Sequence, residues 1–403
     1  MRALAPEVDL GDPGSFEHGV PHKFFTRLRR EDPLHWQPEA GGPGFWVVSR
    51  HADVVAVSKD WQSYSNSRGG IEIIDSPPDE LAMLRMLMLY MDPDEHTTYR
   101  KLVARAFTPR VLRTMQDKID RIARETVDEV IGRDTCDFVP DIAAKLPLPV
   151  IADMLGMPSE DRAKLVTWSN KILGWSDPQY VDQRSDATAA AMEMIQYSTE
   201  LAARKRVEPG DDLTSRLVEV EVDGHKLTDL QFGLFFLMLS IAGNEPIRNL
   251  ISQAMLAFFR FPAQWHLLRE VPSLMETAVE EMMRWATPTM QFRRTATRDL
   301  ALHGKVIQEG DKVTTWFVSA NRDEDVFADP SGFDITRAQN PHLAFGGGGP
   351  HYCVGAHMAR LQAAAMFREL TTRLPGIRLD GEVAHLRSNF ANGIKHLPVR
   401  LHG

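Results

Sequence analysis

The residue with the most distinctive chemistry is Cys353, in the stretch AFGGGGPHYCVG (344–355). It is one of only two cysteines, it follows four consecutive glycines, and a segment with helical periodicity begins near Val354. Because the N-terminus of a helix stabilises an anion, this position favours a thiolate. A thiolate can act as a nucleophile with His351 as its base, or serve as the single sulfur ligand of a haem iron. A zinc site needs several cysteine or histidine ligands, which this chain does not offer.

The glycine run does not fit the common phosphate-binding loops. A P-loop requires Lys and then Ser or Thr after its glycines, and neither follows here. A dinucleotide-binding fold requires a strand just before the glycines and an acidic residue about 20 positions later. The helical character upstream argues against that fold. We interpret the glycines as a turn that allows close approach of the backbone to a flat ligand.

A second candidate site lies inside the apolar segment 229–261, whose centre reads SIAGNEPIRN (240–249). A helix that is apolar on nearly all sides belongs in the middle of a protein. Pro246 has no N–H, so the carbonyl of Ala242 loses its helical partner. Either two helices meet here at a break, or one helix is opened where a ligand lies against it. In the second case the freed carbonyl, Gly243 and Glu245 form a polar groove in an apolar wall.

Three further groups of charged residues have spacings that place them together. Glu281 and Arg284, in EEMMRW (280–285), are i,i+3 partners if the segment is helical. His96 and Arg100 are four apart and share a helix face. Arg294 lies in the basic stretch FRRTATRD. Each of these motifs alone is also typical of a solvated surface pair.

The elements that must position these residues are mostly helices. Short strand-like stretches occur at 44–50, 292–317 and 376–400, near the two ends of the chain. This distribution argues against alternating strands and helices in a doubly wound sheet. We expect a mainly α fold with small peripheral β-sheets, as a single domain over 1–403 with a short irregular lead at 1–20. Helical periodicity is found at 95–107, 109–132, 140–155, 178–206, 229–261, 273–287 and 354–373.

Composition excludes several classes of protein. The net charge of −9 and the absence of a basic run argue against binding to nucleic acid or an anionic membrane. No secretory signal is evident at the N-terminus, and no run of 18 apolar residues occurs. Two cysteines in 403 residues do not make a disulfide framework. We therefore expect a cytoplasmic protein without membrane insertion.

Taken in order, these motifs resemble those of the cytochromes P-450, the haem-thiolate monooxygenases. The cysteine stretch resembles their haem-ligand loop through Phe345, Gly349, His351, Cys353 and Gly355. Phe345 is eight positions before the cysteine, where the common spacing is seven. That longer turn is similar to the turn of actinobacterial members that act on sterols and methyl-branched lipids. The resemblance spans about residues 45–375 and implies the family's single helical domain.

The resemblance implies haem b (iron protoporphyrin IX) as cofactor and O2 as co-substrate. Cys353 would be the iron ligand. Glu281 and Arg284 would form the family's buried structural pair. The haem propionates would be held by four residues, namely His96, Arg100, Arg294 and His351.

The stretch AGNEP (242–246) resembles the family's oxygen-binding groove, with Ala242, Gly243, Glu245 and Pro246 as its members. Pro246 falls where the family has a threonine. In the family the acid and the alcohol help water deliver protons to bound oxygen. A proline side chain can neither donate nor accept a hydrogen bond, so delivery through water, Glu245, backbone carbonyls or a substrate hydroxyl is implied.

The substrate pocket implied by the resemblance is lined mostly by apolar side chains, which favours a hydrophobic small molecule such as a lipid, a steroid or a secondary-metabolite intermediate. Core packing is the alternative explanation of the methionines, because methionine fills irregular apolar space. Electrons would come from a ferredoxin, its reductase and NAD(P)H, and a carrier protein that presents the substrate is left open. A cationic patch of Arg105, Arg110 and Arg113 would steer the ferredoxin. The candidate substrate residues are Met83, Met86, Met88, Leu239, Met290 and Phe292.

Three alternatives remain at this stage. Pro246 is compatible with an oxidation other than hydroxylation, such as ring closure, C–C cleavage or desaturation. It is also compatible with a haem-binding protein that has lost catalysis. A cysteine hydrolase using Cys353 and His351 would need no iron.

Overall fold

Two compact units, each assembled from segments distant in the sequence, build the fold. The computed structural model describes residues 8–104, 109–173, 184–219, 221, 224 and 226–402. Unit 1 comprises Met1–His96, Glu280–Cys353 and His385–Gly393. Unit 2 comprises Thr97–Val279, Val354–Ala384 and Ile394–Gly403.

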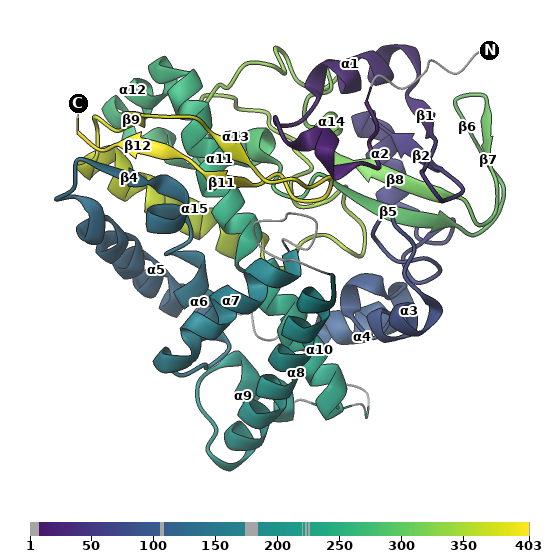
Figure 1. The fold of residues 1–403 in the computed structure, drawn as a ribbon, viewed down its shortest axis with the longest axis horizontal. Coiled ribbons are helices and arrows are strands. Elements are labelled where there is room, and N and C mark those ends of the chain that lie inside the picture. The colour runs from purple at the N-terminus through teal and green to yellow at the C-terminus, as the bar shows by residue number, and fades with distance from the viewer. Residues whose placement is uncertain are drawn as a thin grey trace. The chain divides into compact units, whose positions relative to one another are not determined.

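A five-stranded sheet is the centre of unit 1 (Figure 1). Its strand order is β1-β2-β8-β5-β3; β2 and β8 are parallel, and the other neighbours are antiparallel. Successive residues point to opposite faces of a strand. Accordingly, Val47 packs in one core cluster with Phe25, while Val48 packs in another with Val54. Both faces of the sheet are therefore buried, which explains the nearly continuous apolar character of FWVV.

The elements of unit 1 have the following bounds. The strands are β1 Leu34–Gln37, β2 Phe45–Val48, β3 Tyr64–Ser65, β5 Gln291–Ala296, β6 Leu300–Leu302, β7 Lys305–Ile307 and β8 Lys312–Trp316. The helices are α1 His22–Glu31, α2 His51–Lys59, α3 Pro78–Leu84 and α14 Phe317–Ala320, with short turns η1 Pro13–Phe16 and η2 Met88–Tyr90. Helices α4 Pro93–Ala104 and α13 Met275–Ala286 begin in one unit and end in the other.

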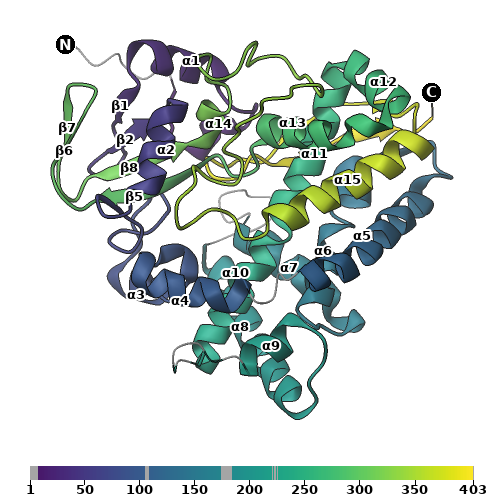
Figure 2. The ribbon, with the colours of Figure 1, turned by 180° about the vertical axis from the view of Figure 1, so that it is seen from behind.

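Unit 2 is built mainly of helices. α15 packs along α5, and both views show these two helices side by side (Figure 2). A three-stranded sheet of order β4-β12-β9 brings the C-terminal strand beside β4. A mainly α fold with small sheets, as predicted from the sequence, is confirmed.

The elements of unit 2 have the following bounds. The helices are α5 Pro109–Val130, α6 Pro147–Met154, α7 Arg162–Leu173, α8 Arg184–Val207, α9 Leu213–Glu219, α10 Asp229–Ala242, α11 Glu245–Arg260, α12 Pro262–Glu270 and α15 Ala356–Arg373. Short turns are η3 Val139–Ala143, η4 Ser159–Asp161 and η5 Pro272–Leu274. The strands are β4 Thr135–Asp137, β9 Arg378–Leu379, β11 Ile394–His396 and β12 Pro398–Arg400, while β10 Ala384–His385 has its first residue in unit 2 and its second in unit 1.

The long apolar segment folds as two helices with a break between them. α10 ends at Ala242 and α11 begins at Glu245, with Pro246 at the second position of the new helix. Proline is tolerated there because that N–H has no partner inside a helix. A Cβ on Gly243 would lie 2.7 Å from Cδ1 of Ile151, so glycine lets α6 approach the break closely. The break thus has local structural causes in proline and glycine.

Together α10 and α11 form a segment, Asp229–Arg260, that is long and apolar enough to cross a membrane by length and composition alone. Within its most apolar window, 56% is buried inside the protein. Burial of this kind is typical of a central helix in a protein core.

Candidate functional site

The loop that carries Cys353 is shaped by its glycines. Gly346, Gly348 and Gly349 have φ of 96°, 89° and 75°, values that side-chain-bearing residues rarely adopt. A Cβ on Gly349 would lie 2.6 Å from the carbonyl oxygen of Ser58, at the end of α2. The loop closes through a 3.0 Å hydrogen bond from the Cys353 N–H to the Phe345 carbonyl. The glycines therefore let the loop turn and pack on α2 while it presents the cysteine.

The two thiols have different environments. Cys353 is exposed, whereas Cys136, in β4, is half-buried. Burial, reinforced by the Asp141 carboxylate, raises the pKa of the Cys136 thiol to about 12. Because the thiolate is the form that attacks or binds a metal, Cys353 is the thiol suited to chemistry. Gly355 is the N-cap of α15, which begins three residues after Cys353.

Two predicted histidines of unit 1 lie together. The ring of His96, which is 1% exposed, has its centroid 4.2 Å from that of His351. Asn66, which the sequence analysis missed, lies with its Nδ2 3.1 Å from Nε2 of His351. Asp92 fixes the loop around Asn66 by accepting from its N–H and from neighbouring serine hydroxyls. The histidine pair is thus held by a polar loop that carries no recognisable motif.

Arg294 is a buried cation in β5. Its Nη1 donates to the Arg293 carbonyl at 2.9 Å, and no carboxylate of the described residues lies within ion-pair distance. Burial lowers the pKa of the Arg294 guanidinium to about 10, with partial compensation from Asp92. A buried cation of this kind requires an anion.

Arg100, in the part of α4 that belongs to unit 2, is half-buried. Its side chain makes neither an ion pair nor a hydrogen bond with any residue that the structure describes. Arg294 and Arg100 each have donors available for an acid. In unit 1, a thiol on a shaped loop and the buried Arg294 guanidinium are donors of the kind that haem b requires, one for iron and the other for a propionate. The residues therefore fit haem.

The Glu281–Arg284 pair in α13 is fully buried and fully hydrogen bonded. Arg284 donates to the carboxylate of Glu281 at 2.7 and 2.8 Å. Both residues are 0% exposed. The remaining donors of Arg284 reach the carbonyls of Asn321, Pro330 and Gly332.

The Glu281 carboxylate is also fully used. It accepts hydrogen bonds from the Asp334 N–H, from Arg337 and from Asn340. The pair therefore joins α13 to the segment 321–340, and its contacts are those of a structural element of unit 1.

Glu245 opens α11 in unit 2 and is 4% exposed. Burial raises the pKa of the Glu245 carboxyl, and this outweighs the lowering by Arg248 and Asn249. Its Oε1 accepts no hydrogen bond from the described part of the chain. Of the other predicted groove residues, Ala242 is exposed and Pro246 is half-buried. Glu245 is thus a buried acid whose pKa lies above the usual value for a glutamate.

The predicted substrate residues fall into buried and accessible groups. Met290 is 1% exposed and packs in the core cluster that contains Trp316, and Met88 is also buried. Met83, in α3, is 41% exposed. The other members are Met86 and Phe292, both half-buried in unit 1, and Leu239, buried in α10 of unit 2. The side chains of Arg105, Arg110 and Arg113 lie outside the described residues.

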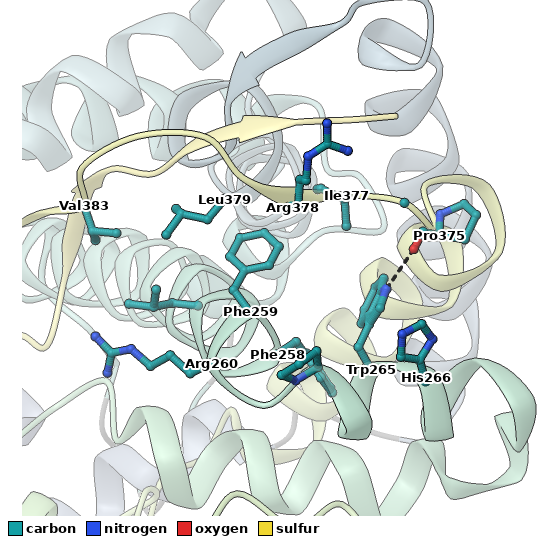
Figure 3. Close-up of a pocket in the computed structure, with 13 residues that line it drawn as sticks. Phe258, Phe259, Arg260, Trp265, His266, Pro375, Ile377, Arg378, Leu379 and Val383 are labelled. Atoms are coloured by element: carbon teal, nitrogen blue, oxygen red, sulfur yellow. Dashed lines mark hydrogen bonds between the residues drawn. The ribbon is translucent and has the colours of Figure 1, made fainter. Parts of the chain in front are cut away.

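A separate hollow of about 440 Å³ lies at the other end of α11 (Figure 3). Phe259 points into it, and Trp265 closes one side by donating to the Pro375 carbonyl at 3.1 Å. None of the site residues predicted from the sequence lines it. It is therefore distinct from the candidate site.

Comparison with known proteins identifies the family. Residues 225–373 match the family model named Cytochrome P450. The steroid C26-monooxygenase of Mycobacterium tuberculosis is 39% identical over 98% of this chain and 93% of its own length. The methyl-branched lipid omega-hydroxylase of the same organism is 39% identical over 98% of this chain and 94% of its own length.

Solved structures of cytochromes P450 are also similar to this chain. The Mycobacterium marinum cytochrome P450 CYP268A2, in complex with pseudoionone, has a TM-score of 0.90 and 39% identity, covering 99% of this chain and 100% of that one. P450BioI, in complex with an acyl carrier protein that bears hexadec-9Z-enoic acid, has a TM-score of 0.86 and 30% identity. The match covers 95% of this chain and 98% of that one. The chain therefore belongs to the cytochrome P450 family, and it is a haem-dependent monooxygenase with O2 as its co-substrate.

Proposed function

We propose that this cytochrome P450 inserts one oxygen atom from O2 into a largely hydrophobic lipid or steroid, with Cys353 as the residue whose thiolate would bind the haem iron. The observation that carries the proposal is the Cys353 loop. It presents an exposed thiol on a glycine-shaped turn, in the same unit as the His96–His351 pair. When bound, haem supplies the activation of O2, and the thiolate favours O–O cleavage.

The chain's own residues hold the cofactor. In unit 1, Arg294 offers a buried guanidinium, and His96 and His351 offer ring nitrogens, to haem carboxylates. Charge-assisted hydrogen bonds to carboxylates are strong because donor and acceptor are both ionised. Glu281 and Arg284 act at a distance by fixing the segment that precedes the cysteine loop.

The substrate class follows from accessible apolar side chains and from the relatives. Met83, Met86 and Phe292 offer apolar surface in unit 1. The relatives that are 39% identical act on a steroid or on a methyl-branched lipid. We infer a substrate of that class, held by hydrophobic contacts.

Proton delivery in this chain centres on Glu245. Its carboxyl is buried, and burial raises its pKa, which favours the protonated form relative to an exposed glutamate. Pro246 has no side-chain donor or acceptor, so the exposed Ala242, the Gly243 backbone, water or a substrate hydroxyl must complete the route. The same lack of an alcohol favours the second candidate function, an oxidation other than hydroxylation, such as ring closure, C–C cleavage or desaturation.

Two kinds of partner protein are proposed. Electrons come from a ferredoxin, its reductase and NAD(P)H. P450BioI has been solved in complex with an acyl carrier protein that bears a fatty acid. This supports testing substrates of the present enzyme in carrier-bound form. Burial of α10 and α11 inside the protein supports a cytoplasmic location.

A carbon monoxide spectrum tests the cysteine ligand. The reduced, haem-loaded protein is expected to show the long-wavelength Soret peak that reports sulfur ligation. Cys353→Ser should abolish the peak, whereas Cys136→Ser, the matched control, should keep it. If both variants behave alike, Cys353 is not the ligand.

Turnover then tests the reaction. Steroids and methyl-branched lipids, free and carrier-bound, are supplied with a surrogate ferredoxin and reductase, and products are identified by mass. A gain of one oxygen atom supports hydroxylation, a loss of two hydrogens supports desaturation, and no product from any of these substrates contradicts the substrate class.

A further inference from the structure

A second buried polar cluster surrounds Glu245 in unit 2. Glu245, Arg248 and Asn249 occupy positions i, i+3 and i+4 of α11, so their side chains lie on one face of the helix. Asn170 of α7 lies against this face and accepts from Nη1 of Arg248 at 3.0 Å. All four residues are buried or half-buried.

The hydrogen bonds of this cluster are incomplete within the described part of the chain. Nη2 of Arg248 lies 3.6 Å from Oε1 of Glu245, which is an ion-pair distance but too long for a hydrogen bond. Oε1 of Glu245 and Nε of Arg248 make no hydrogen bond with a described residue. Asn249 is 1% exposed, and neither its Nδ2 nor its Oδ1 makes a hydrogen bond of good geometry with a described residue, although the amide lies near enough to the Glu245 carboxyl to lower its pKa.

Unsatisfied polar atoms are rare in protein interiors because burial without a partner is unfavourable. Here four such atoms are grouped on one helix face: Oε1 of Glu245 and Oδ1 of Asn249, which are acceptors, and Nε of Arg248 and Nδ2 of Asn249, which are donors. Water supplies both donors and acceptors, and a buried water typically makes about three hydrogen bonds. The grouping is therefore suited to ordered water beside the carboxyl.

We propose that Asn249 and Arg248 are positioning residues for Glu245, with the Asn249 amide providing the donor and acceptor that Pro246 cannot provide. Asn249 orients water against the carboxyl, and Arg248, held by Asn170, sets the charge that the carboxyl experiences. This inference rests on the proposed role of Glu245 in proton delivery.

The charges around Glu245 support Arg248 as the deciding group. On the helices packed near α11, Asp153 of α6 pairs with Arg162 and Lys118, and Lys164 of α7 pairs with Asp161. Among the described residues, only Arg248 lies within ion-pair distance of the Glu245 carboxyl. Its attraction opposes the effect of burial, so Arg248 limits how far burial raises the pKa of the Glu245 carboxyl.

Infrared difference spectroscopy tests the inference without turnover. The band of the protonated Glu245 carboxyl is followed in the holoenzyme as pH is raised, and Glu245→Gln identifies it by removing it. Asn249→Leu and Arg248→Met should each keep the band to a pH higher by about one pH unit, since each removes a group that stabilises the anion. Arg248→Lys keeps the charge and should restore most of the wild-type titration.

Ser252→Ala is the matched control, because Ser252 is buried in the same helix and donates to the Arg248 backbone carbonyl. It should leave the titration unchanged. Each variant is first checked for the sulfur-ligated carbon monoxide spectrum, which shows that the protein has folded and bound haem. If Asn249→Leu and Arg248→Met, so checked, titrate like the wild type, the positioning role is wrong.

The fraction of electrons recovered in product separates this inference from the proposed function. If Glu245→Gln leaves that fraction and its pH profile unchanged, Glu245 does not deliver protons and the proposed function fails at that point. If Glu245→Gln lowers the fraction while Arg248→Met and Asn249→Leu shift neither the infrared titration nor the pH profile, only the positioning inference fails.

Discussion

The chain contains two buried Glu-x-x-Arg pairs with identical spacing, one in α13 of unit 1 and one in α11 of unit 2. Glu281 and Arg284 are joined by two hydrogen bonds of 2.7 and 2.8 Å. Glu245 and Arg248 approach only to 3.6 Å. The spacing is therefore not what separates them; what differs is how many of their donors and acceptors have partners.

The first pair is closed. All five N–H groups of Arg284 are used, two by the Glu281 carboxylate and three by backbone carbonyls. The second pair is open, because Oε1 of Glu245 and Nε of Arg248 make no hydrogen bond with a described residue. A closed pair locks a fold, whereas an open one retains sites for water and protons. Completeness of hydrogen bonding, rather than burial, thus distinguishes the structural pair from the proposed functional one.

Replacing the arginine of each pair by methionine tests this comparison, and it should give the largest change in the free energy of unfolding. Arg284→Met should lower the free energy of unfolding by about 3–5 kcal/mol, because it leaves a buried carboxylate and three carbonyls without their donors. Arg248→Met should lower it by only about 1 kcal/mol, since Glu245 can take up a proton instead of remaining as a buried anion. Urea denaturation of both variants measures the difference.

Glu280→Ala is the control for α13. Glu280 neighbours Glu281, but its side chain is 30% exposed and pairs with His342, so its loss should change the stability by less than about 1 kcal/mol. Equal losses of stability for Arg284→Met and Arg248→Met would show that the two pairs play the same structural part.

The pH dependence of stability gives the next largest effect. The folded-state pKa of Glu245 is raised by burial, so the neutral carboxyl favours the folded state at low pH, and this contribution is lost as pH rises through the folded pKa. At neutral pH, Glu245→Gln should therefore be more stable than the wild type. The gain should vanish below about pH 4, where unfolded glutamate is also protonated.

Urea midpoints of the two proteins at several pH values measure this prediction. If the Glu245→Gln variant is no more stable than the wild type at neutral pH, the protein stabilises the Glu245 carboxylate as an anion. The Glu245–Arg248 pair would then resemble the Glu281–Arg284 pair.

Much of the fold could be predicted from the sequence because it depends on local patterns. Helical periodicity and the scarcity of strand signals predicted a mainly α fold; β2 and β8 lie within the predicted strand stretches, and β5 begins one residue before one of them. The break in the long apolar segment followed from Pro246 and Gly243, whose backbone effects are local. The candidate thiol followed from residue types alone, since Cys353 is one of two cysteines and has glycines before it.

Contacts between distant segments could not be predicted in this way. Asn66 reaches His351 across 285 residues, and Asn170 reaches Arg248 across 78. Asparagine at such positions is unremarkable in sequence, because its role depends on which partner the tertiary fold brings near. Likewise, burial of Met290 in a core cluster and exposure of Met83 depend on packing, which a methionine-rich stretch does not reveal.

A third acidic group extends the comparison to the surface. Asp75, whose side chain is 55% exposed, accepts from Arg293 at 2.6 Å and lies 2.8 Å from Nζ of Lys312. Both cations are buried, and they also bind carbonyls of the loop before Asp75. Partial burial alone would raise the pKa of Asp75, but the hydrogen bonds from Lys312 and Arg293 hold it below its usual value.

Asp75→Asn should therefore have the smallest effect, a loss of less than about 1 kcal/mol at neutral pH, because solvent screens an exposed ion pair. A lowered folded pKa stabilises the protein above the unfolded pKa, and this contribution is lost as pH falls through the folded value. The difference between wild type and variant should thus disappear in acid, and added salt should reduce it at neutral pH. Urea midpoints against pH and salt measure both trends. A loss as large as that of Arg284→Met would show that a partly exposed acid can lock the fold as firmly as the closed pair does, because the two buried cations beneath it depend on its charge.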